Sequence, residues 1–249
     1  MELKRHKYQG LLNVLSFNRH FYVFGLIVFA SIALSQFVVN WNQNVFFLVI
    51  MGFAYGLLMP LFVSSYVYDY SEFYDLDWLK KIDITDDKGN INLNINAGFD
   101  ETSFIIKRKL PNSKLQVYDF YDEQQHTEPA IARARKVSVL YPNTEQIVSN
   151  KIPLEDHSVD HIFLIFAAHE IRSKDEQIQF FKECKRVCKS NGSVILVEHL
   201  RDLPNFLAFS IGFTHFFSKK AWQSVLYASG YSSVHEMKFT PFVSIFNCR

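Results

Sequence analysis

Residues 152–170 read IPLEDHSVDHIFLIFAAHE, and the elements around this stretch decide the fold. Its apolar run, residues 161–166, has the length of a fully buried strand and is followed by polar side chains. Apolar residues at helical spacing follow over residues 175–188, and another apolar run covers residues 193–198. A strand, an amphipathic helix and a second buried strand in this order predict a parallel β–α–β unit.

Units of the same kind extend to both sides of this stretch. Towards the N-terminus the sequence predicts strands at 91–97, 115–118 and 136–141 and helices at 100–110 and 129–135. Towards the C-terminus it predicts a helix at 219–229 and an antiparallel hairpin with strands at 234–239 and 243–247. This alternation predicts an α/β fold with a Rossmann-like, doubly wound sheet, mostly parallel, over residues 90–249.

Doubly wound sheets bind ligands at the carboxyl ends of their strands, near the point where the strand order reverses. The polar residue Asp119 closes the predicted second strand, and a carboxylate there can accept hydrogen bonds from both hydroxyls of a ribose. The turn after the first strand has only Gly98 where a dinucleotide site would carry G-x-G-x-x-G. The sequence therefore favours a nucleoside ligand without a pyrophosphate. It disfavours a nucleotide-dependent oxidoreductase, since no Tyr-x-x-x-Lys pair is present either.

Several motifs resemble one enzyme family in the same order along the chain. Residues 152–162 resemble the LPFPDNSFDxV segment before the fourth strand of class I S-adenosylmethionine-dependent methyltransferases, of the kind that act in quinone and small-lipid methylation. Residues 168–170 stand where these enzymes often carry a paired-histidine turn. Residues 181–192 resemble their E..RVLKPGG segment, and residues 130–136 resemble the helix after the ribose-binding acid.

The resemblance implies S-adenosylmethionine as the methyl donor. It assigns the cofactor to the strand ends. The methionine part would contact Asn96, Ala97 and Gly98, and the ribose would contact Asp119. The adenine would contact Phe120 and Thr144, and the sulfonium would lie over Phe166 and Ala167. For the adenine contact after the third strand, Asn143 and Glu145 are alternatives to Thr144.

A hydroxyl acceptor would be helped by a general base, and three titratable residues face the predicted crevice: His169, Glu170 and His199. Each also has a structural alternative, as a hydrogen-bonding residue for His169, a loop residue for His199 and an arginine partner for Glu170. The aromatic stretch 206–217 could be a lid over the site or a core helix.

Two long uncharged stretches precede this domain, at residues 21–39 and 45–68. Each is long enough to span roughly 30 Å of hydrocarbon as a helix, and a short polar turn joins them. The sequence predicts that residues 1–68 form a two-helix membrane anchor. A signal peptide or a pair of buried helices is a weaker interpretation. Gly52 and Gly56 predict close packing of the two helices or a homodimer through them.

Basic residues flank the two apolar stretches and are missing from the turn between them. Lys4, Arg5, Lys7 and Arg19 come before the first stretch, and Lys80 and Lys81 follow the second. The positive-inside rule then predicts an integral membrane protein with two spans, with both termini and the catalytic domain in the cytoplasm. Residues 69–89 are expected to be an interfacial linker, with aromatic rings at headgroup depth.

The amino-acid composition restricts the classes of binding partner that are expected. The 26 basic and 25 acidic residues leave no surplus charge that would favour nucleic acid. The three cysteines fit reduced, buried thiols. Cys184 and Cys188 lack a second pair of ligands for zinc, so no metal site is predicted.

The sequence thus predicts a membrane-anchored, S-adenosylmethionine-dependent methyltransferase. The anchor favours a lipophilic small molecule or lipid as the acceptor, such as a quinone precursor, because it holds the crevice at the membrane face. The alternative is a non-catalytic, membrane-anchored Rossmann-like domain that binds a nucleoside or a protein, which the loss of turn glycines would favour.

Overall fold

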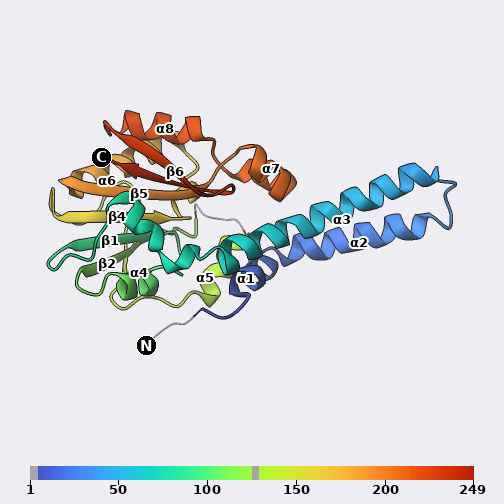
Figure 1. The fold of residues 1–249 in the computed structure, drawn as a ribbon, viewed down its shortest axis with the longest axis horizontal. Helices are drawn as coiled ribbons and strands as arrows, with labels where there is room; N and C mark the ends of the chain where they lie inside the picture. Colours follow the sequence, from blue (N-terminus) through green and yellow to red (C-terminus); the bar gives the residue numbers. More distant parts are fainter. Residues whose placement is uncertain (1–4, 125–128) are drawn as a thin grey trace.

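The computed structural model describes residues 5–124 and 129–249 (Figure 1). Its strands are β1 (Ile91–Asn96), β2 (Lys114–Asp119), β3 (Glu145–Gln146), β4 (Val159–Ile165), β5 (Cys188–His199), β6 (Val234–Thr240) and β7 (Val243–Cys248). Its helices are α1 (Gln9–Phe17), α2 (Arg19–Ser35), α3 (Gln43–Ser65), α4 (Ser103–Lys109), α5 (Pro129–Val137), α6 (Lys174–Val187), α7 (Leu203–Phe209) and α8 (Lys219–Ala228). Short 3₁₀ turns include Ala168–Glu170, after β4, and Ser210–His215, after α7.

The strands form one sheet in the order β3-β2-β1-β4-β5-β7-β6. Strands β1 to β5 pair in parallel, and β7 runs antiparallel to both β5 and β6. The chain moves outward from β1 to β3 and then returns to place β4 on the other side of β1, so the order reverses between β1 and β4. The Rossmann-like, mostly parallel sheet with a terminal antiparallel hairpin is confirmed.

Side chains that alternate along the strands build a core on each face of the sheet. Ile162 and Leu164 of β4 lie in one core, which α6 and α8 cover. Phe163 and Ile165 lie in the other, together with α4 and the segment that follows α3. This two-residue period is what a strand buried on both faces requires.

The segment between the hairpin and β1 belongs to the second core. Phe73, Tyr74 and Trp78 are buried there, and Trp78 donates its indole N–H to the Phe73 carbonyl at 3.0 Å. The prediction that these rings lie in a membrane interface is therefore wrong. The sheet face beside α4 would otherwise expose Phe163 and its neighbours, and these rings cover it.

The third strand also differs from its predicted position at 136–141. Helix α5 continues to Val137, and β3 is the two-residue Glu145–Gln146, which pairs with Tyr118 and Asp119. Val139 and Leu140 are β-prone but exposed. Because neither side chain packs against the core, these two residues do not form a strand despite their β-propensity.

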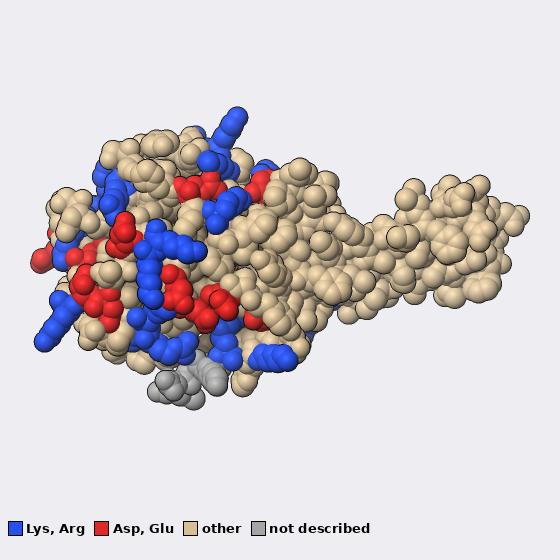
Figure 2. Space-filling model, viewed as in Figure 1, with Lys and Arg blue, Asp and Glu red and all other residues tan. Residues whose placement is uncertain are grey.

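A helical hairpin of α2 and α3 projects from the domain (Figure 1). Asn42 caps α3, because its side-chain oxygen accepts from the backbone N–H groups of Asn44 and Val45. The outer part of the hairpin carries no charged side chain on the visible face (Figure 2). Within residues 5–124 and 129–249, one helix, starting at Gln43, is long and apolar enough to cross a membrane. A second qualifies only if α1 and α2, which meet at a 75° bend, are counted together.

The two helices do not meet at Gly52 and Gly56, where an added Cβ would have no atom within 4 Å. The close approach is at Gly25 of α2, whose added Cβ would lie 2.6 Å from Leu57 Cδ2. The prediction that the glycine pair packs against the first helix is wrong.

Candidate active site

The first two strand ends meet as predicted. Asn96 and Asp119 are register partners at the carboxyl ends of β1 and β2. The buried Asn96 amide donates to the Tyr118 carbonyl at 3.1 Å, and its oxygen accepts from Gly98 N–H at 3.1 Å. Gly98 has a φ of +89°, so the turn after β1 needs a residue without a Cβ.

The Asp119 carboxylate is 2% exposed, and both of its oxygens have partners. One accepts from Tyr121 N–H at 2.8 Å, and the other accepts from Arg135 Nη1 of α5 at 2.7 Å. The Arg135 side chain is 33% exposed, so it can swing into solvent and release its oxygen. The second oxygen of Asp119 is therefore available to a ligand only when Arg135 moves away.

The aromatic residue beside this turn is Tyr121, which the sequence analysis missed. A Cβ on Gly98 would lie 2.9 Å from Tyr121 Cγ, so the ring covers the turn, and the Arg135 guanidinium stacks over it at 4.6 Å. Phe120 is instead buried in the core, with its ring 5.4 Å from that of Phe180. Its predicted adenine contact is wrong. The alternation of side chains at a strand end would have pointed to the neighbouring residue.

Thr144 does not reach the carboxyl edge of the sheet. Its hydroxyl donates to the Tyr141 carbonyl at 2.7 Å, in the turn that comes before β3. Asn143 precedes the strand as well, and Glu145 begins it. These residues come before the carboxyl end of β3, which is at Gln146, so their predicted adenine contact stays a prediction.

Phe166 and Ala167 follow β4 as predicted, across the sheet reversal from Asn96. Phe166 has a φ of +51°, a left-handed conformation that is strained for an aromatic residue. Its ring stacks on that of His199 with centroids 5.1 Å apart, and Ala167 is buried. This sharp turn carries the chain directly to His169.

His199 is a structural residue. Its Nδ1 donates to the Phe242 carbonyl at 2.9 Å, and its Nε2 lies 2.7 Å from the Tyr68 hydroxyl. The ring is stacked between Phe166 and Phe216. Burial lowers the pKa of His199 to about 4. With both nitrogens engaged inside an aromatic stack, it is not placed to take a proton from a substrate.

His169 and Glu170 lie together at the end of β4, in the 3₁₀ turn Ala168–Glu170. His169 Nδ1 is 2.8 Å from Glu198 Oε2, and its Nε2 is 3.4 Å from Glu170 Oε1. Burial by itself lowers the pKa of His169, but the carboxylates of Glu198 and Glu170 outweigh it and raise the pKa to about 10. The buried Glu198, from β5, is a site residue that the sequence analysis did not select.

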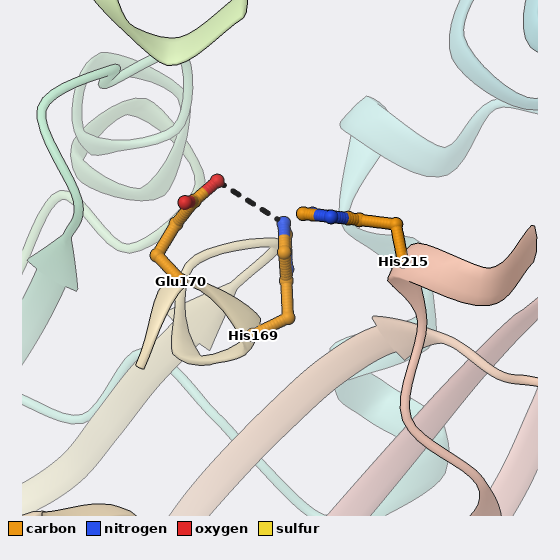
Figure 3. A group of neighbouring side chains, drawn as sticks. All are labelled: His169, Glu170 and His215. Carbon is orange, nitrogen blue, oxygen red and sulfur yellow. Dashed lines mark ion pairs between the residues drawn. The ribbon is translucent and has the colours of Figure 1, made fainter. Parts of the chain in front are cut away.

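A second histidine reaches the same place from a different element. His215, in the turn Ser210–His215, points its ring at His169 across a centroid distance of 5.2 Å (Figure 3). Arg172 Nη1 donates to the carbonyls of both His169 and His215, at 3.0 and 2.9 Å. Nothing near His215 in the sequence indicates this meeting, because it depends on how α7 folds back.

The comparisons with known proteins agree with this geometry. Residues 114–196, which run from β2 into β5, match the family model described as a methyltransferase domain. This match supports a methyltransferase of the class I type that uses S-adenosylmethionine. No curated protein sequence matches the chain.

Solved methyltransferase structures share the fold. Human N-acetylserotonin methyltransferase in complex with S-adenosylmethionine is 12% identical, with a TM-score of 0.54 over 95% of this chain and 69% of its own. A putative O-methyltransferase from Nostoc punctiforme is 12% identical, with a TM-score of 0.53 over 95% and 71%. A SAM-dependent methyltransferase from Aquifex aeolicus is 20% identical, with a TM-score of 0.49 over 72% and 93%.

The polar groups at these strand ends have the chemistry that a nucleoside cofactor needs. The Asp119 carboxylate can accept hydrogen bonds from ribose hydroxyls, whereas the Tyr121 ring fills the space beside the Gly98 backbone. Asn96, Ala97 and Ala167 line the two strand ends on either side of the reversal. A ligand at Gly98 would have to displace the Tyr121 ring, and a ligand at the second oxygen of Asp119 would have to displace Arg135.

Proposed function

We propose that this protein is a membrane-anchored methyltransferase that transfers a methyl group from S-adenosylmethionine to a hydroxyl of a lipophilic acceptor. The observation that carries the proposal is that the apolar hairpin and the cofactor crevice are joined by α1, which contacts both. The crevice therefore opens close to the hairpin, where a membrane-dissolved acceptor would be concentrated.

Helix α1 is tied to the loop after the cofactor turn through Glu101. Glu101 Oε1 accepts from Gln9 Nε2 at 3.0 Å and from Asn13 Nδ2 at 2.9 Å, and it pairs with Arg5 at 2.9 Å. These contacts hold α1 beside the turn that carries Gly98. Because α1 meets α2 at Asn18, the base of the hairpin is fixed relative to this turn.

The same helix end also contacts α5, which carries Arg135. Arg133 donates to the Phe17 carbonyl and lies 2.7 Å from His20 Nδ1 at the start of α2. The rings of Phe17 and Phe99 meet edge to face at 5.2 Å. Both walls of the cofactor crevice thus contact the junction between α1 and α2.

The segment from Leu203 to His215, which we call the lid, lies on the side of His169 and Glu170 and supports a lipophilic substrate. Helix α7 and the turn after it expose large apolar side chains, at Leu203, Phe206, Leu207 and Ile211. The Tyr55 hydroxyl of α3 donates to the Leu207 carbonyl at 2.6 Å, so the lid lies against the hairpin. This exposed apolar surface supports a lid at the membrane and argues against a core helix for this stretch.

The chain's residues have separate tasks in this reaction. Bound S-adenosylmethionine supplies a methyl group on a positively charged sulfur. Asn96 and Asp119 position the cofactor, while His169 and Glu170 receive the acceptor hydroxyl beside Ala167. As the oxygen forms its bond to the methyl carbon, the carbon–sulfur electron pair would return to sulfur and the hydroxyl proton would pass to the Glu170 carboxylate. Positioning and water exclusion supply most of the rate.

The membrane part of the proposal follows the predicted arrangement of two spans, with both termini and the catalytic domain on the cytoplasmic side. A groove of about 430 Å³ at the base of α2 has Arg19 and His20 at one edge and apolar side chains along the rest. Such a groove suits the boundary between headgroups and hydrocarbon. Lys4 lies outside the described residues. A homodimer through the helices stays a prediction.

The first test is calorimetric titration of the detergent-purified, full-length protein with S-adenosylmethionine. We expect micromolar binding that Asp119→Ala weakens at least tenfold, because the ribose loses a charged acceptor. Glu123→Ala, which removes an exposed carboxylate nearby, is the matched control and should bind normally. No binding by folded wild-type protein would instead favour the non-catalytic anchored domain.

A further inference from the structure

Two histidines and a glutamate converge on the acceptor side of the crevice, at His169, Glu170 and His215 (Figure 3). Each offers one ligand atom, and the three atoms lie within 4.8 Å of one another. We propose that these residues form a binding site for one divalent transition-metal ion, of which Zn²⁺ is the reference case.

The spacing of the first two ligands already suits a metal. His169 Nε2 and Glu170 Oε1 are 3.4 Å apart. Ligands about 2.05 Å from a tetrahedral ion lie roughly 3.4 Å from each other. The third ligand, His215, is partly exposed at the lid, so a rotation of its side chain can bring the nitrogen to the same spacing.

An independent observation also points to a ligand. The buried Glu198 holds His169 twice, through Nδ1 at 2.8 Å and through the backbone N–H at 3.1 Å. The Glu198 carboxylate keeps a proton on Nδ1, so a metal ion would displace only the proton that Nε2 shares with Glu170, and the Nε2 lone pair would then be the ligand. Histidines that bind metals nearly always donate their other ring N–H to a carboxylate, a carbonyl or water.

The two ligand-bearing turns are also held together by a residue that is not itself a ligand. Arg172 bridges the carbonyls of His169 and His215. This clamp brings the lid turn to the end of β4 and reduces the conformational freedom that metal binding would have to remove. Its guanidinium also stacks over Phe217 at 4.6 Å, which orients it from the lid side.

The donor set selects the kind of ion. Imidazole nitrogen suits Zn²⁺, Co²⁺, Ni²⁺ and Fe²⁺, whereas Mg²⁺ and Ca²⁺ prefer oxygen ligands. The carboxylates of Glu170 and Glu198 lie close together with little exposure, and a dication would balance their charge. Three protein ligands leave one position of a tetrahedral ion open, as in catalytic sites.

The consequence for catalysis rests on the proposed function, whereas metal binding does not. An acceptor hydroxyl in the open position would lose its proton to water more readily, because the metal lowers its pKa. The oxygen lone pair would then form the bond to the methyl carbon as the carbon–sulfur bond breaks towards sulfur. The acceptor class is therefore a lipophilic alcohol, phenol or enol.

The site can be tested with tag-free, full-length protein in detergent. The protein is first treated with a chelator to remove any bound metal and is then titrated with a metal salt. We expect one equivalent of Zn²⁺ by calorimetry and one equivalent of Co²⁺ with the visible absorption of a tetrahedral complex. His215→Ala and Glu170→Gln should each weaken binding at least tenfold. His235→Ala, which removes an exposed histidine of β6, is the matched control and should leave binding unchanged.

Failure of this site is distinguishable from failure of the proposed function. Absence of saturable binding by the wild type, or equal binding by all four proteins, would overturn the metal site. The chelated protein is titrated with S-adenosylmethionine in parallel, and that binding should persist in His215→Ala. Thermal unfolding of each variant confirms that it is folded, since Glu170→Gln keeps the shape and His215 is only partly buried.

Discussion

At the scale of the residue, the crevice owes its chemistry to a few buried polar groups whose neighbours set their charge. His169 stands between two carboxylates, while His199 is enclosed by rings and hydrogen-bonded on both nitrogens. The same residue type is therefore held cationic in one place and neutral in the other. Both were candidates for the base, but the cationic His169 already carries its proton and both nitrogens of His199 are engaged.

The neutral His199 makes stability depend on pH. Its pKa is about 4 in the folded protein, against about 6.5 when unfolded, so protonation favours unfolding below pH 6.5. The stability that it contributes is fully present above pH 6.5 and is lost as the pH falls towards 4. At pH 5 the loss should be about 2 kcal/mol.

Chemical denaturation at pH 7.5 and pH 5 checks this prediction. His199→Gln keeps a donor and an acceptor but cannot titrate, so between pH 7.5 and pH 5 the unfolding free energy of the wild type should fall by about 2 kcal/mol relative to that of the variant, whatever the other groups contribute to both. An equal change in both proteins would show that His199 does not titrate as the aromatic stack requires.

At the scale of the element, α7 links the hairpin to the acceptor site. Its exposed apolar side chains and the bond from Tyr55 to the Leu207 carbonyl predict that the lid touches the bilayer. A nitroxide on Ile211→Cys in vesicles should be relaxed more by oxygen, which enters hydrocarbon, than by a polar nickel chelate. On Lys220→Cys of α8 the order should reverse. Similar ratios at the two sites would contradict a lid at the membrane.

The chain's own thiols permit this labelling. The three native cysteines are buried, and burial raises the pKa of the Cys188 thiol to about 12. Thiolates are the reactive form, so an introduced exposed cysteine should label selectively.

At the scale of the whole molecule, the proposed membrane anchoring depends on the length of the hairpin helices. Helix α3 continues into turns that reach the core, whereas α2 has 17 residues and a length of about 26 Å. A span of that length is short for roughly 30 Å of hydrocarbon, and basic side chains at its base would then lie near the headgroups.

The two-span arrangement predicts opposite sidedness for the hairpin tip and the domain. In sealed vesicles, a maleimide that cannot cross the membrane should label the Asn40→Cys variant from one side only. It should label the Lys220→Cys variant only from the other side. Labelling of both from one side would mean that the hairpin enters and leaves the same leaflet. The 75° bend between α1 and α2 makes that outcome worth testing.

Local patterns were sufficient for the parts of this protein that local physics controls. The apolar runs at β4 and β5, the helical spacing of α6 and the acid at the end of β2 each follow from neighbours within one element. The Rossmann-like sheet, the meeting of Asn96 and Asp119 at two strand ends and the place of His169 and Glu170 after β4 could therefore be predicted. The uncharged hairpin was visible for the same reason.

Tertiary structure decided whatever depends on partners distant in the chain. It placed Tyr121 over Gly98 in place of Phe120, buried the rings of 73–78 against the sheet, and closed His199 inside an aromatic stack. His215 follows His169 by 46 residues and meets it only because α7 folds back against the hairpin. Periodicity reports which face of an element is apolar, whereas the identity of the partner on that face depends on how elements pack.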